Sequence, residues 1–214
     1  MKTNDNAATP SEQHWLILSH CFNMDGRAAS LTITDKLKYL TERGIKFIVL
    51  SGVSGTHDNR FEHLQLLPWG PSGLRFDLRH VVAMRFGRGV IYRLVGLFTS
   101  IILSPFVVLE RLLFVLQSQS SWVFPAVIRS LWLIHKHRPT VIYSTGGAYS
   151  AHHAGYWLKR LTGIKWIAEI HDPMVIAGGR KSRNERFMAK LEGYICRNAD
   201  LVWWFTEGAL ESAR

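Results

Sequence analysis

The chain has 214 residues, of which 47% are hydrophobic and 20% are charged. This composition is typical of a globular protein and excludes a wholly disordered chain. No repeat of 20–50 residues is visible, which excludes solenoids and propellers. Lys and Arg number 26 against 16 Asp and Glu, and the resulting net charge of +10 indicates an anionic partner. The two cysteines, Cys21 and Cys196, are too few for a disulfide framework and fit a reducing compartment.

The positive charge is concentrated in the middle of the chain. The stretch from Arg75 to Arg138 holds nine basic residues and two acidic ones, Asp77 and Glu110. It is also the most apolar part of the sequence. A stretch that is both basic and apolar favours a membrane surface over nucleic acid, and no polar loop alternates basic with aromatic residues as a nucleic-acid site would. We therefore expect no nucleic-acid partner.

In chain order, the polar residues 1–13 lack the apolar segment of a signal peptide, and we expect a disordered tail there. Short apolar runs then alternate with helical spacing. The expected strands are His14–Ser19, Lys46–Leu50, His63–Leu67, Val141–Ser144, Lys165–Ile170 and Leu201–Phe205. The expected helices are Ala28–Arg43, Val90–Leu116, Trp122–His137, Ser150–Thr162 and Ser182–Asn198, with Thr206 capping one more. The alternation predicts an α/β fold with a Rossmann-like, doubly wound parallel sheet over residues 14–214.

Ligands in such sheets bind at the carboxyl ends of the strands, so the loops that follow the strands are the candidate sites. The loop after the first strand has one glycine, Gly26, and not the three of a dinucleotide-binding fingerprint. A P-loop is absent as well. NAD enzymes and P-loop ATPases are therefore poor fits.

Thr145-Gly146-Gly147-Ala148-Tyr149 lies between an expected strand and an expected helix. Two glycines there let the backbone approach a ligand, and the helix N-terminus offers N–H groups to an anion. The alternative is a tight turn that needs a positive φ.

His171-Asp172-Pro173 follows the fifth strand. A histidine there can exchange a proton near neutral pH, with Asp172 orienting it or binding a hydroxyl group. The alternative is a loop-capping histidine. His152 and His153 are adjacent on one helix and face different ways, so we expect no metal site.

The segment Val90–Leu116 has an unusual pattern. Its charge-free run, Leu94–Leu109, contains Pro105 and is shorter than the roughly 20 residues that span a bilayer, which favours an interfacial or buried helix. Small and polar residues form one narrow stripe: Arg93, Gly96, Ser100, Ser104 and Arg111. The rest is apolar and must be covered by the helix Trp122–His137, by a partner or by lipid. The arginines that precede it favour lipid.

Four segments together resemble the N-terminal domain of the GT-B glycosyltransferases, in particular retaining glycosyltransferase family 4. They are 23–44, which begins Asn23-Met24-Asp25-Gly26-Arg27, then 139–152, 162–173 and 198–207. Residues 68–119 carry little of the likeness.

The resemblance implies an enzyme, a hexosyltransferase, whose N-terminal domain binds the acceptor while a C-terminal domain binds the nucleotide-sugar. It implies His171 as the catalytic residue near the transferred sugar. It also implies one set of substrate-binding residues: Asp25, Gly26, Arg27, Thr145, Gly146, Gly147, Tyr149 and Asp172. Family members with lipid-linked acceptors often dock on the cytoplasmic membrane through a basic, apolar face. Here that face is formed by the helices of about 75–138, including Arg75, Arg79, Arg85, Arg88, Arg93, Leu97 and Phe98.

One feature of the family is missing. Its donor-binding domain carries two glutamates separated by seven residues, and this sequence has no such pair. We therefore expect a domain that acts in polysaccharide biosynthesis with a nucleotide-sugar as co-substrate, no further cofactor and no metal. We expect it to be inactive without a donor-binding domain or partner subunit. The alternative is a non-catalytic, membrane-docked subunit that recruits a separate donor-binding protein.

Overall fold

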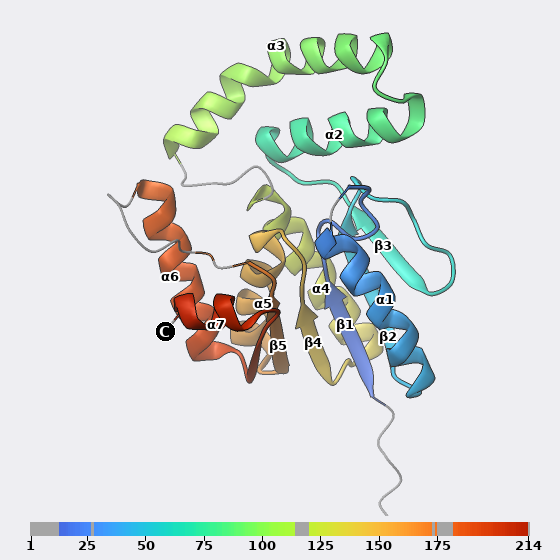
Figure 1. Ribbon diagram of the computed structural model, residues 1–214, viewed down its shortest axis with the longest axis vertical. Helices are drawn as coiled ribbons and strands as arrows, with labels where there is room; N and C mark the ends of the chain where they lie inside the picture. The colour runs from blue at the N-terminus through green and yellow to red at the C-terminus, as the bar shows by residue number, and fades with distance from the viewer. Residues whose placement is uncertain (1–12, 27, 114–119, 173, 175–181, 214) are drawn as a thin grey trace, which may run out of the picture.

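The computed structural model describes residues 13–26, 28–113, 120–172, 174 and 182–213. It contains a parallel sheet of six strands in the order β3-β2-β1-β4-β5-β6 (Figure 1). The strands are β1 His14–Leu18, β2 Lys46–Gly52, β3 Glu62–Leu66, β4 Val141–Ser144, β5 Lys165–Ile170 and β6 Leu201–Trp204. The helices are α1 Ala28–Glu42, α2 Pro71–Phe86, α3 Val90–Leu113, α4 Val123–His137, α5 Tyr149–Thr162, α6 Arg183–Asn198 and α7 Glu207–Ala213, with a 3-10 turn at Ser120–Trp122.

The doubly wound parallel sheet is confirmed, with every expected strand present and its ends shifted by at most two residues. The chain builds outward from β1 to β2 and β3, then crosses back to β4 beside β1. In doubly wound sheets, ligands bind at such a reversal, which lies here between β1 and β4 at their carboxyl ends. Leu18 pairs with Ser144 at that edge, so the loops after these two strands emerge side by side. The expected tail at residues 1–13 lies outside the described residues except for Gln13.

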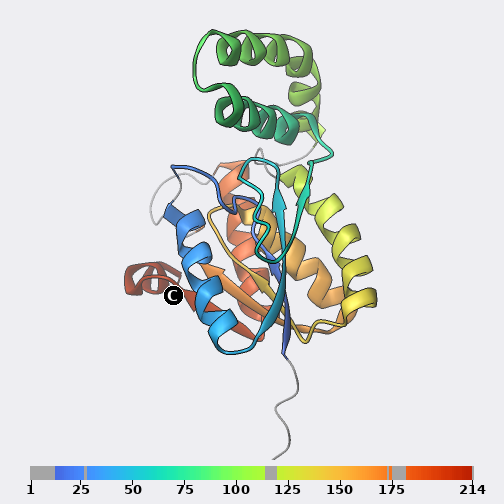
Figure 2. The same ribbon diagram turned by 90° about the vertical axis from the view of Figure 1, so that its right-hand side faces the viewer.

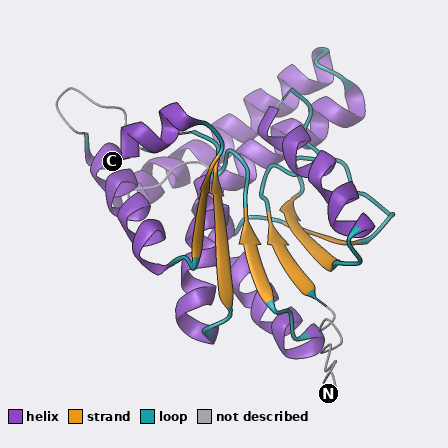
Figure 3. Cartoon of the chain, turned by 60° about the horizontal axis from the view of Figure 1, so that its bottom comes forward, coloured by secondary structure: helices purple, strands orange, loops and turns teal. Residues whose placement is uncertain are grey.

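Helices cover both faces of the sheet (Figure 3). On one face α4, α5 and α6 enclose the larger core, in which Leu16, Leu50, Trp122 and Trp166 are fully buried. On the other face α1 packs Ile33 and Leu37 over Ile17 and Val49. The alternation of side chains along each strand divides the residues between these two cores.

Helices α2 and α3 form a hairpin that stands beyond the carboxyl ends of the strands (Figures 1 and 2). Helix α2 was not among the helices expected from the apolar spacing, although the resemblance placed membrane-facing helices at about 75–138. Pro71 in fact begins the helix, since proline is well suited to the first helical position. The hairpin is attached through α2, where Phe76 packs against Cys21, Met24 and Ala148.

Helix α3 turns its narrow small and polar side toward α2. Gly96, Ser100 and Ser104 are partly buried there, while Val107 and Glu110 are buried. Twelve large apolar side chains are exposed on the rest of its surface: Val90, Ile91, Leu94, Leu97, Phe98, Ile101, Ile102, Phe106, Val108, Leu109, Leu112 and Leu113. Burial of this surface against residues 122–137 was one expectation, and it is wrong because α3 packs along α2 instead. The 24 residues of α3 are long and apolar enough to cross a membrane, by length and composition alone.

Candidate functional site

A polar cluster lies at the carboxyl ends of β4 and β5, on the face covered by α1. Glu169 is the last residue but one of β5 and points away from the core that holds Trp166 and Ala168. Tyr143 and Thr145 reach it from β4, and Lys36 reaches it from α1. His171 follows the end of β5. Side chains from three elements, α1, β4 and β5, therefore meet at one carboxylate.

Glu169 is fully buried and has a partner for each oxygen. Oε1 accepts a hydrogen bond from the Lys36 ammonium group in an ion pair. Oε2 accepts from the Tyr143 hydroxyl and from Thr145 Oγ1, which lies 2.6 Å away. A buried carboxylate with this many donors is a satisfied charge rather than an isolated one.

The donors around Glu169 decide its ionisation. Burial by itself raises the pKa of a carboxyl, but the hydrogen bonds from its four neighbours outweigh burial and hold the pKa of Glu169 well below its usual range. Burial, and then the adjacent carboxylate, raise the pKa of Tyr143, which therefore remains a phenol and a donor. The cluster thus carries a fixed negative charge at neutral pH, compensated by Lys36.

His171 lies against this cluster and is 8% exposed. Its Nε2 is 3.3 Å from Thr145 Oγ1 and 3.6 Å from Glu169 Oε2. Since the Thr145 hydroxyl hydrogen is directed at Glu169, Nε2 of His171 is best assigned as the protonated nitrogen. That assignment leaves Nδ1 with the lone pair of the neutral ring. Phe205 stacks on the ring at 4.9 Å between centroids and fixes its plane.

A second chain of hydrogen bonds supports β4 from the opposite face. Trp166 Nε1 donates to Ser144 Oγ at 2.9 Å, and Ser144 Oγ lies 2.9 Å from Nδ1 of His152. Ser144 Oγ therefore accepts from the indole and makes a second hydrogen bond with His152. Burial lowers the pKa of His152 to about 4, with a further contribution from His171, so the ring is neutral and structural.

The glycine loop of residues 145–149 connects β4 to α5, and its first residue, Thr145, belongs to the Glu169 cluster. Gly146 has φ of 100°, which requires glycine, so the tight-turn interpretation holds for this residue. Ala148 caps α5 without a side-chain hydrogen bond to the first helical N–H groups. Tyr149 is half-buried, and its pKa is raised by burial and by the carboxylates of Asp172 and Glu192. The Tyr149 hydroxyl therefore lies within the electrostatic influence of the Asp172 carboxylate.

Asp172 is exposed, and among the described residues it makes no ion pair with His171. The carboxylate beside the His171 ring is Glu169, which the sequence analysis did not single out. Two signals point to it in hindsight. It is the one acidic residue in the apolar run Lys165–Ile170, and it lies two positions before His171 on the same side of the strand.

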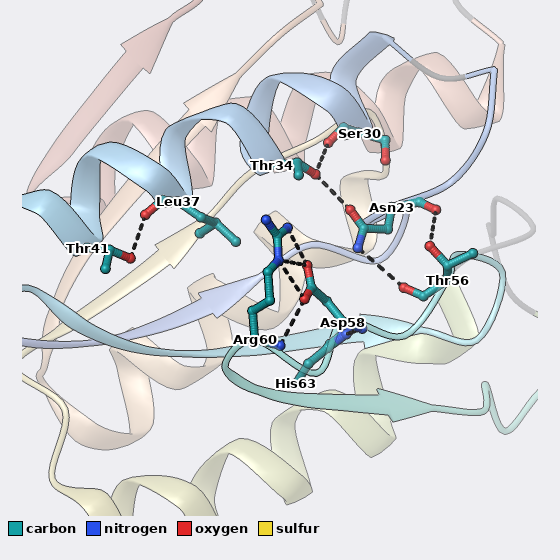
Figure 4. A network of polar contacts seen from close by, with 9 residues as sticks. All are labelled: Asn23, Ser30, Thr34, Leu37, Thr41, Thr56, Asp58, Arg60 and His63. Atoms are coloured by element: carbon teal, nitrogen blue, oxygen red, sulfur yellow. Dashed lines mark hydrogen bonds and ion pairs between the residues drawn. The ribbon is translucent and has the colours of Figure 1, made fainter.

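The loop after β1 is tied to its neighbours by a separate network (Figure 4). Asn23 has φ of 51°, accepts a hydrogen bond from Thr34 at 2.8 Å and exchanges bonds with Thr56. Nearby, the hydrogen bond from Arg60 is the largest factor that lowers the pKa of Asp58 to about 2. Asp25 and Gly26, which come after the buried Met24, are exposed. Arg27 lies outside the described residues.

The expected membrane-facing residues lie on the hairpin. Leu97 and Phe98 are exposed on the outer side of α3, at 59% and 66%. Arg75, Arg79 and Arg88 line a groove between α2 and α3, whereas Arg85 and Arg93 are exposed outside it.

As for metals, the described part of the chain has no group of three or more His, Cys, Asp and Glu side chains that would hold an ion.

Comparison with protein families decides the relationship. A family model described as a glycosyl transferase 4-like domain matches residues 39–214. The chain belongs to the glycosyltransferase 4-like family. Within the matched range lie three of the four segments that carried the resemblance, including the glycine loop and the end of β5. The loop at Asp25 precedes it.

Other comparisons add little to this glycosyltransferase-like domain. None of the curated proteins compared matches it. Among solved structures, a variant Serratia marcescens short-chain dehydrogenase/reductase aligns at 12% identity and a TM-score of 0.34, covering 94% of this chain and 99% of that one. A putative nagD protein aligns at 15% identity and a TM-score of 0.18, covering 91% and 71%. Scores this low carry no weight for function.

Proposed function

We propose that this domain is the acceptor side of an enzyme that transfers a sugar from a nucleotide-sugar to a glycan or lipid-linked acceptor, with retention, at the cytoplasmic face of a membrane. One observation supports this more than any other. Helix α3, whose outer side is apolar and exposed, stands beyond the carboxyl ends of the strands (Figure 1), and His171 directly follows the carboxyl end of β5. A membrane bound at α3 therefore brings a lipid-linked acceptor toward His171.

In this proposal His171 is the residue that touches the reacting groups. The cluster holds its Nε2, and Nδ1 is left to accept a hydrogen bond from the acceptor hydroxyl or the transferred sugar. Glu169 acts through His171, because its Oε2 lies 3.6 Å from Nε2 and orients the ring. The substrates are expected along Asp25, Gly26, Arg27, Gly146, Gly147, Tyr149 and Asp172.

The donor enters as a co-substrate. We propose that the nucleotide-sugar is held by a donor-binding domain or by a partner subunit, because the paired glutamates expected for donor binding are missing from this sequence. The 214-residue chain alone is then expected to turn over no sugar. Release of UDP or GDP from a nucleotide-sugar by the purified chain with lipid acceptors would overturn this part of the proposal.

The test of transfer uses cells of the source organism that lack this protein. They are complemented with the wild type, with His171→Ala or with His135→Ala, an exposed histidine on α4 that serves as the matched control. Membranes receive radiolabelled UDP- and GDP-sugars, and label is counted in the lipid and polysaccharide fractions. We expect the wild type and His135→Ala to restore incorporation and His171→Ala to reduce it by at least about a hundredfold, the usual weight of a proton-transfer residue.

The alternative, a docked subunit without catalytic residues, is favoured by the same missing donor elements. It predicts a different result in the same assay. Loss of the protein would abolish incorporation, yet His171→Ala would restore it fully, and a pull-down with the chain would return a separate donor-binding protein. If deletion leaves incorporation unchanged, neither function holds.

A further inference from the structure

The groove between α2 and α3 has a volume of about 430 Å³. Small-molecule sites commonly measure about 300–1,000 Å³. Residues of both helices and of the turn between them line it, from Ser72 and Arg111 near the sheet to Arg88 at the turn. The Ser72 N–H donates to Glu110 at 2.9 Å and the Arg79 guanidinium to the Tyr92 hydroxyl, so these two bonds hold the walls together.

Four arginines line the groove: Arg75, Arg79, Arg88 and Arg111. The lining includes no acidic residue. The acidic residues of the two helices are turned elsewhere, since Asp77 lies 3.6 Å from His20 in the interior and Glu110 is taken by Ser72. Among the described residues, none of the four guanidinium groups pairs with a carboxylate.

Such a concentration of guanidinium groups fits a phosphate. Arginine presents its N–H groups in a fork that binds phosphate oxygens in pairs, and several arginines together neutralise a dianion or a diphosphate. Tyr92 contributes as well. Its hydroxyl accepts from Arg79 and keeps its own hydrogen to donate.

The apolar part of the groove indicates that the phosphate is attached to a lipid. Phe76, Ala83 and Val107 lie among the arginines, and the outer side of α3 continues as an exposed apolar surface. A headgroup in the groove leaves its chain free to run along that surface. A soluble phosphate compound would make no use of it.

We propose that this groove binds the terminal phosphate (a phosphomonoester) or diphosphate headgroup of a membrane lipid. Its position deepens the proposed function, on which this part rests. Phe76 lines the groove and also packs against Ala148, which follows the glycine loop. A lipid-linked acceptor held by its phosphate in the groove would present its sugar end to the loop and to His171.

The test measures binding of the purified chain to vesicles by sedimentation. Phosphatidylcholine vesicles carry either farnesyl diphosphate or phosphatidylserine, at levels that give the same surface potential. We expect the wild type to bind the diphosphate vesicles at least about tenfold more tightly, the weight of roughly one charge-assisted hydrogen bond. A wild-type chain that binds both vesicles equally would overturn the proposal.

Two double variants remove the same charge from different places. Arg75→Gln with Arg111→Gln removes two of the four positive charges that line the groove. Arg85→Gln with Arg93→Gln removes two positive charges from exposed arginines outside it. We expect the groove variant to lose the preference for diphosphate and the control to keep it while binding both vesicles more weakly. Equal behaviour of the two variants would contradict a built site.

A conservative variant guards against misfolding. Arg75→Lys with Arg111→Lys keeps the charge but not the paired hydrogen bonds, and we expect it to lose most of the preference at an unchanged melting temperature. Inorganic diphosphate is the competitor. If it displaces the chain at concentrations similar to farnesyl diphosphate, the ligand is a soluble phosphate and the lipid assignment is wrong.

The vesicle assay needs no sugar transfer. A groove without phosphate preference would therefore leave the transfer result with His171→Ala standing. A transfer assay that fails would in turn leave the vesicle result standing.

Discussion

His171 and Glu169 form one unit at the end of β5. Nε2 of the histidine lies 3.6 Å from Oε2 of the glutamate, and the hydroxyl of Thr145 joins both. The glutamate is ionised and buried, while the histidine retains a small exposed area. The glutamate charge is buried, and the histidine ring is the exposed part of the unit, which the proposed function assigns to substrate contact.

Replacing Glu169 by Gln tests this unit. The change leaves Lys36 and His171 without their carboxylate, and we expect the free energy of unfolding to fall by about 3 kcal/mol, as for other broken buried ion pairs. Glu42→Gln is the control, because its contact with Lys38 is exposed and 4.0 Å long. It should cost less than about 0.5 kcal/mol. Urea unfolding of the three proteins gives the comparison.

The same pair of variants predicts a pH dependence. The folded pKa of Glu169 lies below the ordinary carboxyl value of 4.5, so its stabilising contribution is fully present above that pH. The contribution is lost as the pH falls from there toward the folded pKa. Glu169→Gln should therefore differ most from the wild type at neutral pH and approach it in acid. A difference that is constant between pH 3 and pH 7 would contradict an ionised Glu169.

Ser144→Ala tests the chain from Trp166 to His152. It leaves a buried indole N–H and a buried imidazole nitrogen without partners, and we expect a loss of about 1–3 kcal/mol in unfolding free energy. Ser130 on α4 is the matched control, since it is fully buried with no hydrogen-bond partner for its hydroxyl among the described residues. Ser130→Ala should be neutral or stabilising. If both variants behave alike, the chain has no energetic weight.

Two helical glycines should respond in opposite ways to alanine. At Gly155 a methyl group would lie 2.5 Å from Trp166 Nε1, and the indole is held by Ser144, so Gly155→Ala should destabilise the protein by about 1–3 kcal/mol. At Gly96 in α3 no atom lies within 4 Å of the new methyl group. There the better helix propensity of alanine should stabilise by up to about 1 kcal/mol. Thermal unfolding separates the two cases.

Charge placed on the outer side of α3 tests the membrane proposal. Leu97→Glu with Phe98→Glu removes two side chains that would enter the lipid, each worth about 1.5–3 kcal/mol when buried. We expect binding to anionic vesicles to fall more than about tenfold with an unchanged melting temperature. Leu31→Glu, on the exposed side of α1 at 64%, is the control and should keep vesicle binding. Equal binding by all three proteins would exclude α3 as the docking surface.

The alternation of strands and helices could be predicted because the spacing of apolar residues in each element is a property of neighbouring residues in the sequence. The apolar runs at residues 46–50 and 165–170 predict strands wherever they pack, and Gly44 and Gly163 end helices because both adopt a positive φ. Helix α2 was missed because its pattern is broken by polar and basic residues. Its stability comes from packing against α3 and from the contact of its own Phe76 with Cys21, Met24 and Ala148, rather than from its own periodicity.

The sequence by itself determined the parallel sheet, the end of β5 as a candidate site and the apolar excess of α3, because residue order and spacing encode them. It showed the narrow polar stripe of α3 but not the direction in which it faces. Only the tertiary structure decided that this stripe packs on α2 and leaves the apolar surface outside. It also decided that Lys36, Tyr143 and Thr145 converge on Glu169. Lys36 and Glu169 are 133 positions apart in the chain, and such a contact depends on how the strands and helices pack.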